Sequence, residues 1–361
     1  MSADRATRLE SDVAERGLDA LLVTNLVNVR WLCGFTGSNA AVIVGAGDAS
    51  RRVFITDFRY LTQATDQVGD AWEHRIAPDL LAQAAQDLGD GPLRVGFDDT
   101  HITVKQHARL VELVGDGIEL VPAGGAVEAL RAVKDADEIA KIRAAAKVAD
   151  DAFTEVILDG GIVGRTERDV ALDLEVAMRR RGAESVSFPP IIAAGAHGAL
   201  PHAEPRDVAI PANTLVVVDW GAQLNGYASD CTRTVATGDL DPRDIEVYEL
   251  VLRAQEAALE AVRPGPTGRE VDAVAREIID GAGHAEHFGH GLGHGVGMEV
   301  HEGPRLSKLG DTALTAGHVV TVEPGVYLPG AVGVRIEDLV AVTETGADVL
   351  NGLPKSLTFV S

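Results

Sequence analysis

The sequence predicts a chain of two domains: a smaller α/β domain, followed by a larger domain built from two related halves. The chain has 361 residues, enough for two domains of roughly 150 residues each. Over residues 1–122, short apolar runs alternate with helical patterns, which is typical of an α/β domain with a central sheet. Over residues 123–361, one helix-start pattern occurs twice, 101 residues apart. We therefore predict a domain boundary between residues 122 and 123.

The elements of the first domain follow from its apolar runs. A helix that contains Leu9 comes first, and the runs predicted as strands are Ala20–Val23, Ala41–Val44, Val53–Thr56 and Val95–Phe97. The sequence VPAGG at residues 121–125 indicates a break. One long helix is then expected from Val127 to Leu158, because apolar residues recur among charges and two glycines follow. Trp72 is expected to be a scattered exposed apolar residue.

The second domain contains a faint internal repeat. Thr166, Arg168, Asp169, Val170 and Gly182 correspond to Thr267, Arg269, Glu270, Val271 and Gly283. Helix-start chemistry alone could produce part of this match, because threonine followed by acids is a common helix N-terminus. We favour a duplication. A duplicated domain can build a functional site at the junction of its halves, with ligands from both.

Composition and charge exclude several functions. Lys and Arg total 32 against 55 for Asp and Glu, a formal charge of −23, which disfavours nucleic-acid phosphates and anionic membranes as partners. No apolar run approaches the roughly 18 residues that span a bilayer, and the polar N-terminus lacks a signal segment. Cys33 and Cys231 form no CxxC pair. We expect a cytoplasmic protein that binds neither nucleic acid nor membranes.

Five residues of the second domain form the most informative group: Asp219, Asp230, His294, Glu323 and Glu337. Each lies in a short apolar, glycine-punctuated pattern, where a lone buried charge would be costly. Four buried carboxylates would repel one another unless cations lay among them. Two divalent cations balance four carboxylates and leave room for a bridging hydroxide, so the group predicts a two-metal hydrolase site.

The local patterns place these residues near one another. LVVVD ends in Asp219, and a return strand carries Asp230 eleven residues later, so a hairpin brings the two carboxylates to one face. Residues 284–302 hold five of the eleven histidines among alternating glycines, which predicts an irregular strand with His294 as a ligand. His284 and His287 are expected to lie at the surface or behind the ligands.

The last two acids follow β-branched or apolar runs. Glu323 ends VVTVE before a proline, and Arg335 lies two residues before Glu337. Arg335 can orient a metal carboxylate or hold a substrate carbonyl or carboxylate; the alternative is a surface ion pair with Glu337. An oxygen-rich ligand set with one histidine favours manganese, cobalt, iron or zinc over copper, and argues mildly against magnesium.

Several motifs together resemble the pita-bread metallopeptidases, a family that includes methionine aminopeptidase, aminopeptidase P, Xaa-Pro dipeptidase (prolidase) and creatinase. They are DWGAQLNGYASDCTRT, HFGHGLGHGVGMEVHEGP, VTVEPGVY and GVRIED, with SFPPIIAAGAHGALPHAEP before them and NVRWLCGFTGSNAAVIV near the N-terminus. The resemblance implies an α/β creatinase-type N-terminal domain plus an α+β pita-bread C-terminal catalytic domain of two αββ halves. It also implies a dinuclear site, with manganese first and cobalt, zinc or iron as alternatives.

The resemblance further implies roles for single residues. Asp219 is expected to be a terminal ligand, Asp230 and Glu337 bridges, and His294 with Glu323 the ligands that complete the second metal. Glu323 is also our candidate to carry the proton from water to the leaving nitrogen. His202 and His301 are expected to bind substrate or stabilise the tetrahedral intermediate, and His290 and Arg335 to lie at the substrate. Two departures stand out: Trp220 where phenylalanine is usual, and His197 where asparagine is common.

The expected reaction is hydrolysis of a peptide bond that precedes proline, in a homodimer. Prolidase is favoured, and aminopeptidase P, which acts on longer peptides, stays open. Methionine aminopeptidase normally lacks an N-terminal domain of this kind and an arginine like Arg335. A creatinase-like hydrolase lacks the metals, and a non-catalytic binding protein on this fold tends to lose the ligands, whereas this chain keeps all five.

Overall fold

A computed structural model of the chain describes residues 2–46 and 51–361. The chain divides into two compact units, residues 1–131 and 132–361, and each is treated by itself. The boundary predicted after residue 122 stays a prediction. None of the helices described is both long and apolar enough to cross a membrane.

The first unit contains a six-stranded sheet in the order β4-β3-β2-β1-β5-β6. Its strands are β1 (Ala20–Val23), β2 (Ala40–Gly45), β3 (Val53–Thr56), β4 (Glu73–Ile76), β5 (Leu93–Phe97) and β6 (Ile118–Pro122). The helices around it are α1 (Ser2–Glu15), α2 (Leu26–Cys33), η2 (Phe58–Tyr60), α3 (Leu61–Gln67), α4 (Leu80–Leu88), α5 (Val104–Leu113) and α6 (Ala126–Ala132). The four predicted strands and the first helix are confirmed.

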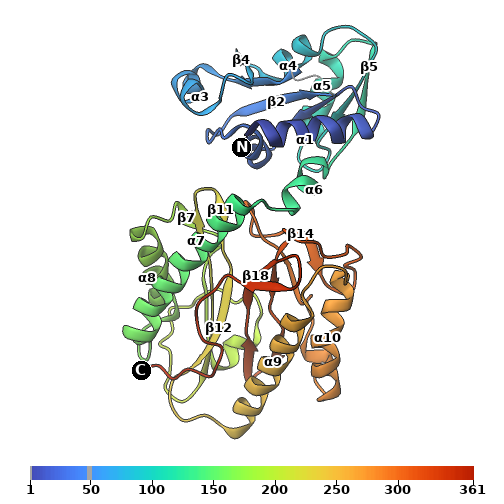
Figure 1. Cartoon of the computed structure of the whole chain (residues 1–361). Coiled ribbons are helices and arrows are strands. Elements are labelled where there is room, and N and C mark those ends of the chain that lie inside the picture. The colour runs from blue at the N-terminus through green and yellow to red at the C-terminus, as the bar shows by residue number, and fades with distance from the viewer. Residues whose placement is uncertain (1, 47–50) are drawn as a thin grey trace. The chain divides into compact units, whose positions relative to one another are not determined.

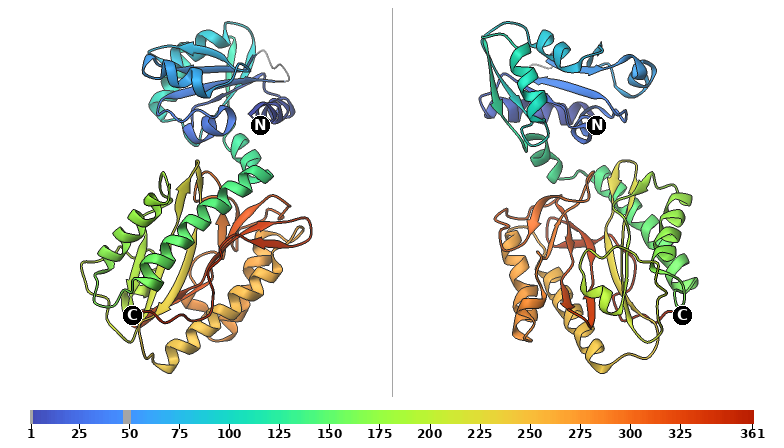
Figure 2. Two further views of the ribbon diagram at one scale, coloured as in Figure 1. Left: turned by 60° about the vertical axis from the view of Figure 1, so that its left-hand side comes forward. Right: turned by 180° about the vertical axis from the view of Figure 1, so that it is seen from behind.

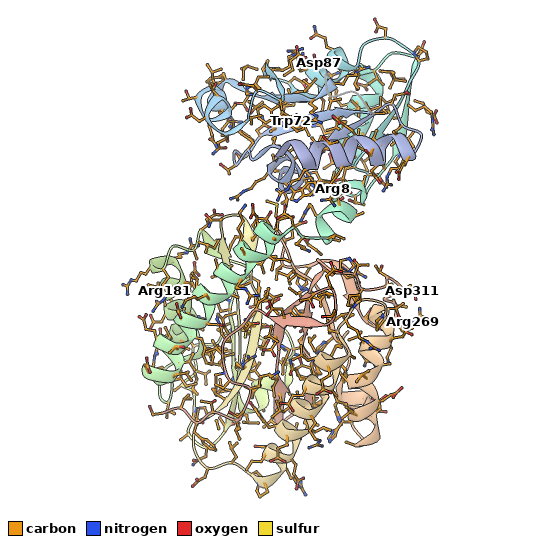
Figure 3. The ribbon with its side chains drawn as sticks, in the orientation of Figure 1. Arg8, Trp72, Asp87, Arg181, Arg269 and Asp311 are labelled. Atoms are coloured by element: carbon orange, nitrogen blue, oxygen red, sulfur yellow. The ribbon has the colours of Figure 1, made fainter. Side chains whose placement is uncertain are left out.

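Two features of this unit differ from expectation. The strands β4 and β6 were not predicted, because both lie at edges of the sheet, where a strand needs fewer apolar residues. The β4 sequence, EHRI, has no fully buried residue. Trp72, labelled in Figure 3, is only 4% exposed. The expectation that it is a surface residue is wrong, since its large apolar ring is buried in the unit.

The second unit begins with α7 (Ala136–Phe153), which continues into a π-helical turn, η3 (Thr154–Asp159). The prediction of one helix over 127–158 is wrong, because α6 ends at Ala132 and α7 starts afresh. Asp135 caps α7 with a capping box to Glu138, and the Lys134 amide donates to the Gly317 carbonyl over 2.8 Å. The helical periodicity continues across this short interruption, so the pattern alone does not reveal it.

The two halves of this unit have the expected duplicated architecture. The elements of the first half are α8 (Glu167–Arg180), β7 (Ser185–Val186), β8 (Ile191–Ala194), η4 (Gly195–Ala199), β9 (Leu215–Trp220), β10 (Ala222–Leu224), β11 (Tyr227–Ala228) and β12 (Cys231–Ala236). Those of the second half are α9 (Pro242–Ala261), α10 (Gly268–Gly281), η5 (Ala285–His287), β13 (Gly293–Gly295), β14 (Glu302–Leu306), β15 (Val319–Val322), β16 (Gly325–Leu328), β17 (Val332–Arg335), β18 (Asp338–Val342) and β19 (Ala347–Val349). Figures 1 and 2 show α7 and α8 on one side, α9 and α10 on the other, and the strands between them.

The predicted repeat corresponds to equivalent structure in the two halves. Thr166 and Thr267 are the N-caps of α8 and α10, and each side chain accepts from a backbone amide three residues on. Each threonine also forms an isolated antiparallel bridge, Thr166 to Ala209 and Thr267 to Ala313. The strands form sheets ordered β12-β9-β8, β11-β10-β7, β14-β13-β15-β18-β19 and β16-β17. Carboxylates from both halves can therefore meet between the two helical layers.

Candidate metal centre

Three of the predicted ligands meet at the end of the β9–β12 pair. These strands are antiparallel, with Asp219 opposite Thr232, and Asp230 directly precedes β12. The Glu337 amide donates to the Thr232 carbonyl over 3.1 Å, which brings the second half to this strand. Asp219, Asp230 and Glu337 each offer a carboxylate oxygen, and these atoms lie within 4.8 Å of one another.

The other two predicted ligands come from β13 and from the residue that follows β15. His294 Nε2 lies 3.6 Å from Asp230 Oδ2 and 3.3 Å from Glu323 Oε1. The expected irregular strand is confirmed: β13 is three residues long, and its register shifts between Gly293 and Gly295. A Cβ at Gly293 would lie 2.0 Å from the Thr321 carbonyl oxygen, so glycine is required for this close approach. All five predicted ligands thus lie together.

Burial makes this carboxylate cluster electrostatically costly. Asp230 is 5% and Glu337 1% exposed, and burial, reinforced by the neighbouring carboxylates, raises the pKa of both well above the usual range. Burial also raises the pKa of Asp219, although Arg335 opposes the shift. Asp219 Oδ1 and Glu337 Oε1 are buried without a hydrogen-bond partner. Buried anionic oxygens without donors are the atoms that a cation would satisfy, so the donor set fits divalent metal ions.

His294 is oriented as a metal ligand requires. Its Nδ1 lies 3.1 Å from the Gly295 carbonyl oxygen, which can only accept, so Nδ1 carries the hydrogen and Nε2 faces the carboxylates. Burial alone would lower the pKa of His294, but the hydrogen bond and charge of Glu323, with the Gly295 carbonyl and the Asp219 charge, together outweigh burial and raise it. Burial alone would raise the pKa of Glu323, but the hydrogen bond and the charge of His294, together with the charge of Arg335, outweigh burial and lower it. In the metal-free protein, the His294 imidazole and the Glu323 carboxylate therefore stabilise each other's charged forms.

Two threonines hydrogen-bond to the candidate ligands, and neither was predicted as a site residue from the sequence. Thr232 Oγ1 accepts from Arg335 Nε at 3.0 Å and donates to Glu337 Oε2 at 2.7 Å. Thr321 Oγ1 accepts from the His294 amide at 3.1 Å and donates to Glu323 Oε1 at 3.0 Å. Thr232 and Thr321 each lie two residues from a predicted ligand along the chain. Strand alternation could have identified them, since residues two apart share a face.

Arg335 is buried, and protein atoms occupy its guanidinium. Its Nη2 donates to Asp219 Oδ2 at 2.6 Å and its Nη1 to Tyr327 Oη at 2.8 Å and to the Pro201 carbonyl at 3.2 Å. The alternative of a surface ion pair with Glu337 is wrong, because Arg335 is 3% exposed and pairs with Asp219. These contacts support the expectation that Arg335 orients a metal carboxylate.

His290 joins the same network through Tyr327. Its Nδ1 lies 2.7 Å from the Gly291 carbonyl oxygen and so carries the hydrogen. Burial lowers the pKa of His290, which keeps the ring neutral. Its Nε2 therefore accepts from the Tyr327 hydroxyl at 2.9 Å, and burial keeps that hydroxyl protonated by raising its pKa to about 12. A chain of hydrogen bonds thus runs from Arg335 through Tyr327 to His290.

The predicted histidines at the rim are less constrained. The His301 ring lies 4.3 Å from that of His294, centroid to centroid. Burial, reinforced by the charge of His294, lowers the pKa of His301. His202 and His301 are both exposed. Both can therefore reach a bound molecule beside the carboxylate cluster.

The two departures from the family pattern, Trp220 and His197, each have partners outside the five candidate ligands. Trp220 is fully buried, stacks on Phe153 at 4.4 Å and donates its Nε1 hydrogen to the Ala149 carbonyl. His197 Nδ1 lies 3.1 Å from Glu167 Oε1. The Nδ1 atoms of His284 and His287 lie 3.1 Å from each other, and both residues are half-buried.

The chain is similar over almost its whole length to several known proteins. An Xaa-Pro dipeptidase from Pyrococcus horikoshii is 43% identical over 95% of both chains. The solved structure of an Xaa-Pro dipeptidase from Bacillus anthracis matches with a TM-score of 0.94 and 38% identity, and covers 100% of both chains. That of an X-Pro aminopeptidase from Thermotoga maritima matches with a TM-score of 0.88 and 36% identity, over 96% of this chain and 99% of that one.

Models of two families match the chain in succession. Residues 5–133 match the creatinase/prolidase N-terminal domain, and residues 140–344 match metallopeptidase family M24. Membership of that family implies divalent metal ions, in keeping with the buried, partly unsatisfied acidic cluster. The chain therefore belongs to metallopeptidase family M24 and carries the creatinase/prolidase type of N-terminal domain.

Proposed function

We propose that this protein is a metal-dependent Xaa-Pro dipeptidase. The main support is that four carboxylates and one imidazole from both halves of the unit lie together, and two of the buried carboxylate oxygens have no hydrogen-bond donor. Relatives named Xaa-Pro dipeptidase that match almost the whole chain support the choice of substrate.

Two divalent ions, with manganese as our first choice and cobalt, zinc or iron as alternatives, would be held by Asp219, Asp230, His294, Glu323 and Glu337. Bound there, such ions supply a water that ionises near neutral pH, with a pKa of about 7, and polarise the scissile carbonyl. The support is the ligand chemistry: oxygen donors dominate, and the single imidazole presents Nε2.

The protein's own side chains would move the proton and stabilise the charge. Glu323, whose pKa the contact with His294 lowers, is ionised at neutral pH. It can accept a proton at a carboxylate oxygen and pass it to the leaving nitrogen. The exposed His202 and His301 would donate hydrogen bonds to the carbonyl oxygen as negative charge develops on it. A prolyl amide has no N–H to grip, so a site that recognises the carbonyl and the ring is suited to it.

Aminopeptidase P is the second candidate, because the X-Pro aminopeptidase from Thermotoga maritima matches nearly as well as the dipeptidases do. The two enzymes differ in whether residues after the proline are accepted. A non-catalytic binding protein on the same fold is less well supported, since this chain retains the complete acidic cluster. A homodimer and a cytoplasmic location stay predictions from the sequence and its resemblance.

The decisive assay compares an Xaa-Pro dipeptide with an Xaa-Pro-Yaa tripeptide as substrates of the purified, metal-loaded protein. We expect a higher kcat/KM on the dipeptide. Preference for the tripeptide would identify an aminopeptidase P instead. Absence of turnover on both substrates, with metal bound, would favour a non-catalytic binding protein.

A further inference from the structure

We propose that a buried aspartate–arginine pair on α10, Asp272 with Arg276, is a positioning device for the substrate-side histidine His290. This inference rests on the proposed function. The two residues lie four apart on one helix face, a spacing that usually indicates an exposed ion pair. Here Asp272 is 1% and Arg276 8% exposed. Charges this buried are costly unless several good hydrogen bonds satisfy them, so their other partners identify what the pair does.

Those partners are the backbone of the segment that carries His290. Arg276 binds both carboxylate oxygens of Asp272, through Nε and Nη2, each at 2.8 Å. Its Nη1 donates to the Phe288 carbonyl at 2.9 Å, and its Nη2 donates to the His290 carbonyl at 2.8 Å. Asp272 Oδ1 accepts from the Leu292 amide at 3.0 Å. One ion pair therefore holds three backbone groups within five consecutive residues.

The segment needs such a clamp. Residues 288–292 belong to no helix or strand, and two of the five are glycines, so the free chain would sample many conformations. The Arg276 guanidinium also lies 4.2 Å from the centre of the Phe288 ring, a cation–π contact that fixes the start of the segment. The helix that carries the clamp is firmly anchored, because Val271, Ala275 and Ile279 lie in the buried core of the second half.

The clamp acts on His290 rather than on the metal ligands. His294 has its own anchors: its amide donates to Thr321 Oγ1, and its neighbour Gly295 pairs with Val320. The His290 carbonyl accepts from Arg276 Nη2, and the His290 ring lies 2.9 Å from the Tyr327 hydroxyl. The far end of the segment meets Glu323, whose amide donates to the Leu292 carbonyl over 2.8 Å, but the Glu323 carboxylate has its own anchor in Thr321. Loosening the clamp should displace the His290 ring while leaving the ligand group in place.

The first half of the unit has no counterpart of this pair. The residues 101 positions earlier are Ala171 and Glu175, and Glu175 instead pairs with Arg179 in an exposed contact. The clamp is therefore a feature of the half that carries His290 and not a general requirement of the repeated helix.

The test compares Arg276→Lys with Asp272→Asn and with a matched control, Arg269→Lys. Lysine keeps the charge but cannot reproduce the forked donor pattern that reaches Asp272, Phe288 and His290 together. Arg269 is on the same helix and pairs with Asp311 at the surface (Figure 3), with its side chain 55% exposed. We expect R276K and D272N to raise the KM for an Xaa-Pro dipeptide about 10-fold, with kcat within about 2-fold, normal metal content, and no change in R269K.

A second readout does not depend on turnover. In the metal-free protein, the ¹⁵N chemical shift of His290 Nε2 reports its hydrogen bond to Tyr327, and we expect it to move in R276K and not in R269K. Unchanged KM and an unchanged shift in active R276K would overturn the proposal. Loss of bound metal with an unchanged KM would also overturn the proposal. Misfolding of both R276K and D272N, while R269K folds, would overturn it as well. If the wild-type protein cleaves no Xaa-Pro bond, the proposed function fails first, and the ¹⁵N shift still tests the clamp.

Discussion

Replacing Thr232 by valine tests whether the hydroxyl between Arg335 and Glu337 holds the cluster in shape. The side chain is fully buried, and its oxygen makes two hydrogen bonds, at 3.0 Å to Arg335 Nε and 2.7 Å to Glu337 Oε2. Valine keeps the shape but removes both. Since Glu337 Oε1 already lacks a donor, the variant would leave the whole carboxylate without a side-chain hydrogen bond.

The expected cost follows from these partners. Hydrogen bonds to charged groups contribute about 1.5–3 kcal/mol each, so two of them sum to about 3–6 kcal/mol. Protonation limits the loss, because burial and the neighbouring carboxylates already raise the pKa of Glu337 and a neutral carboxyl is less costly to leave unpaired. We therefore expect T232V to lower the free energy of unfolding of the metal-free protein by about 3 kcal/mol.

The assay is urea unfolding of the metal-free protein, with Thr232→Ser as the matched control. Serine keeps the hydroxyl and loses only a buried methyl group, worth about 1 kcal/mol. We expect T232V to be less stable than T232S. After metal is restored, we also expect the kcat/KM of T232V to be lower than that of T232S. Equal stability of the two variants would show that this hydroxyl does not hold Glu337.

Three further perturbations have definite outcomes. Glu323→Gln should lower kcat by at least about 100-fold, as loss of a general base does, and a near-normal rate with metal bound would rule out that role. Glu167→Gln should lower kcat about 10-fold without loss of fold. The Glu167 carboxylate accepts from the Ala194 amide, from His197 and from the backbone and side chain of Arg206, and so holds both ends of the segment that carries His202. An unchanged rate would show that His202 needs no such anchor. In the metal-free protein, Glu337 and His294 have raised pKa values in the folded state, so their stabilisation is complete below their unfolded pKa values and is lost as pH rises through the folded ones. The melting temperature should therefore fall as pH rises above about 6.5, the ordinary pKa of histidine, and should recover when metal is added. A flat profile would contradict this.

The candidate ligands could be picked out from the sequence because each breaks a simple rule. An acid at the end of a β-branched run, such as Asp219 or Glu323, has no ordinary reason to be there, so a special role is the economical explanation. The threonines beside them break no rule, since threonine is common in strands. Thr232 and Thr321 could be identified only once the ligands' own positions in the fold were known.

The clamp on α10 was hidden for the opposite reason. Asp272 and Arg276 form the i, i+4 pattern that most surface helices show, and burial is decided by what packs against the helix, which the local sequence does not state. The edge strand β4 was missed because it lacks an apolar run, and the end of α6 because a single aspartate cap, Asp135, interrupts an otherwise helical pattern.

The central claim is that one imidazole and four carboxylates bind a pair of divalent ions on which hydrolysis depends. Its most direct test is the stoichiometry of metal binding to the stripped protein, measured by calorimetry while dipeptidase activity is followed in the same titration. We expect two ions per chain and activity that returns as they bind, with both lost in Asp230→Asn. Activity that survives complete removal of metal, or a stripped protein that binds none, would contradict it.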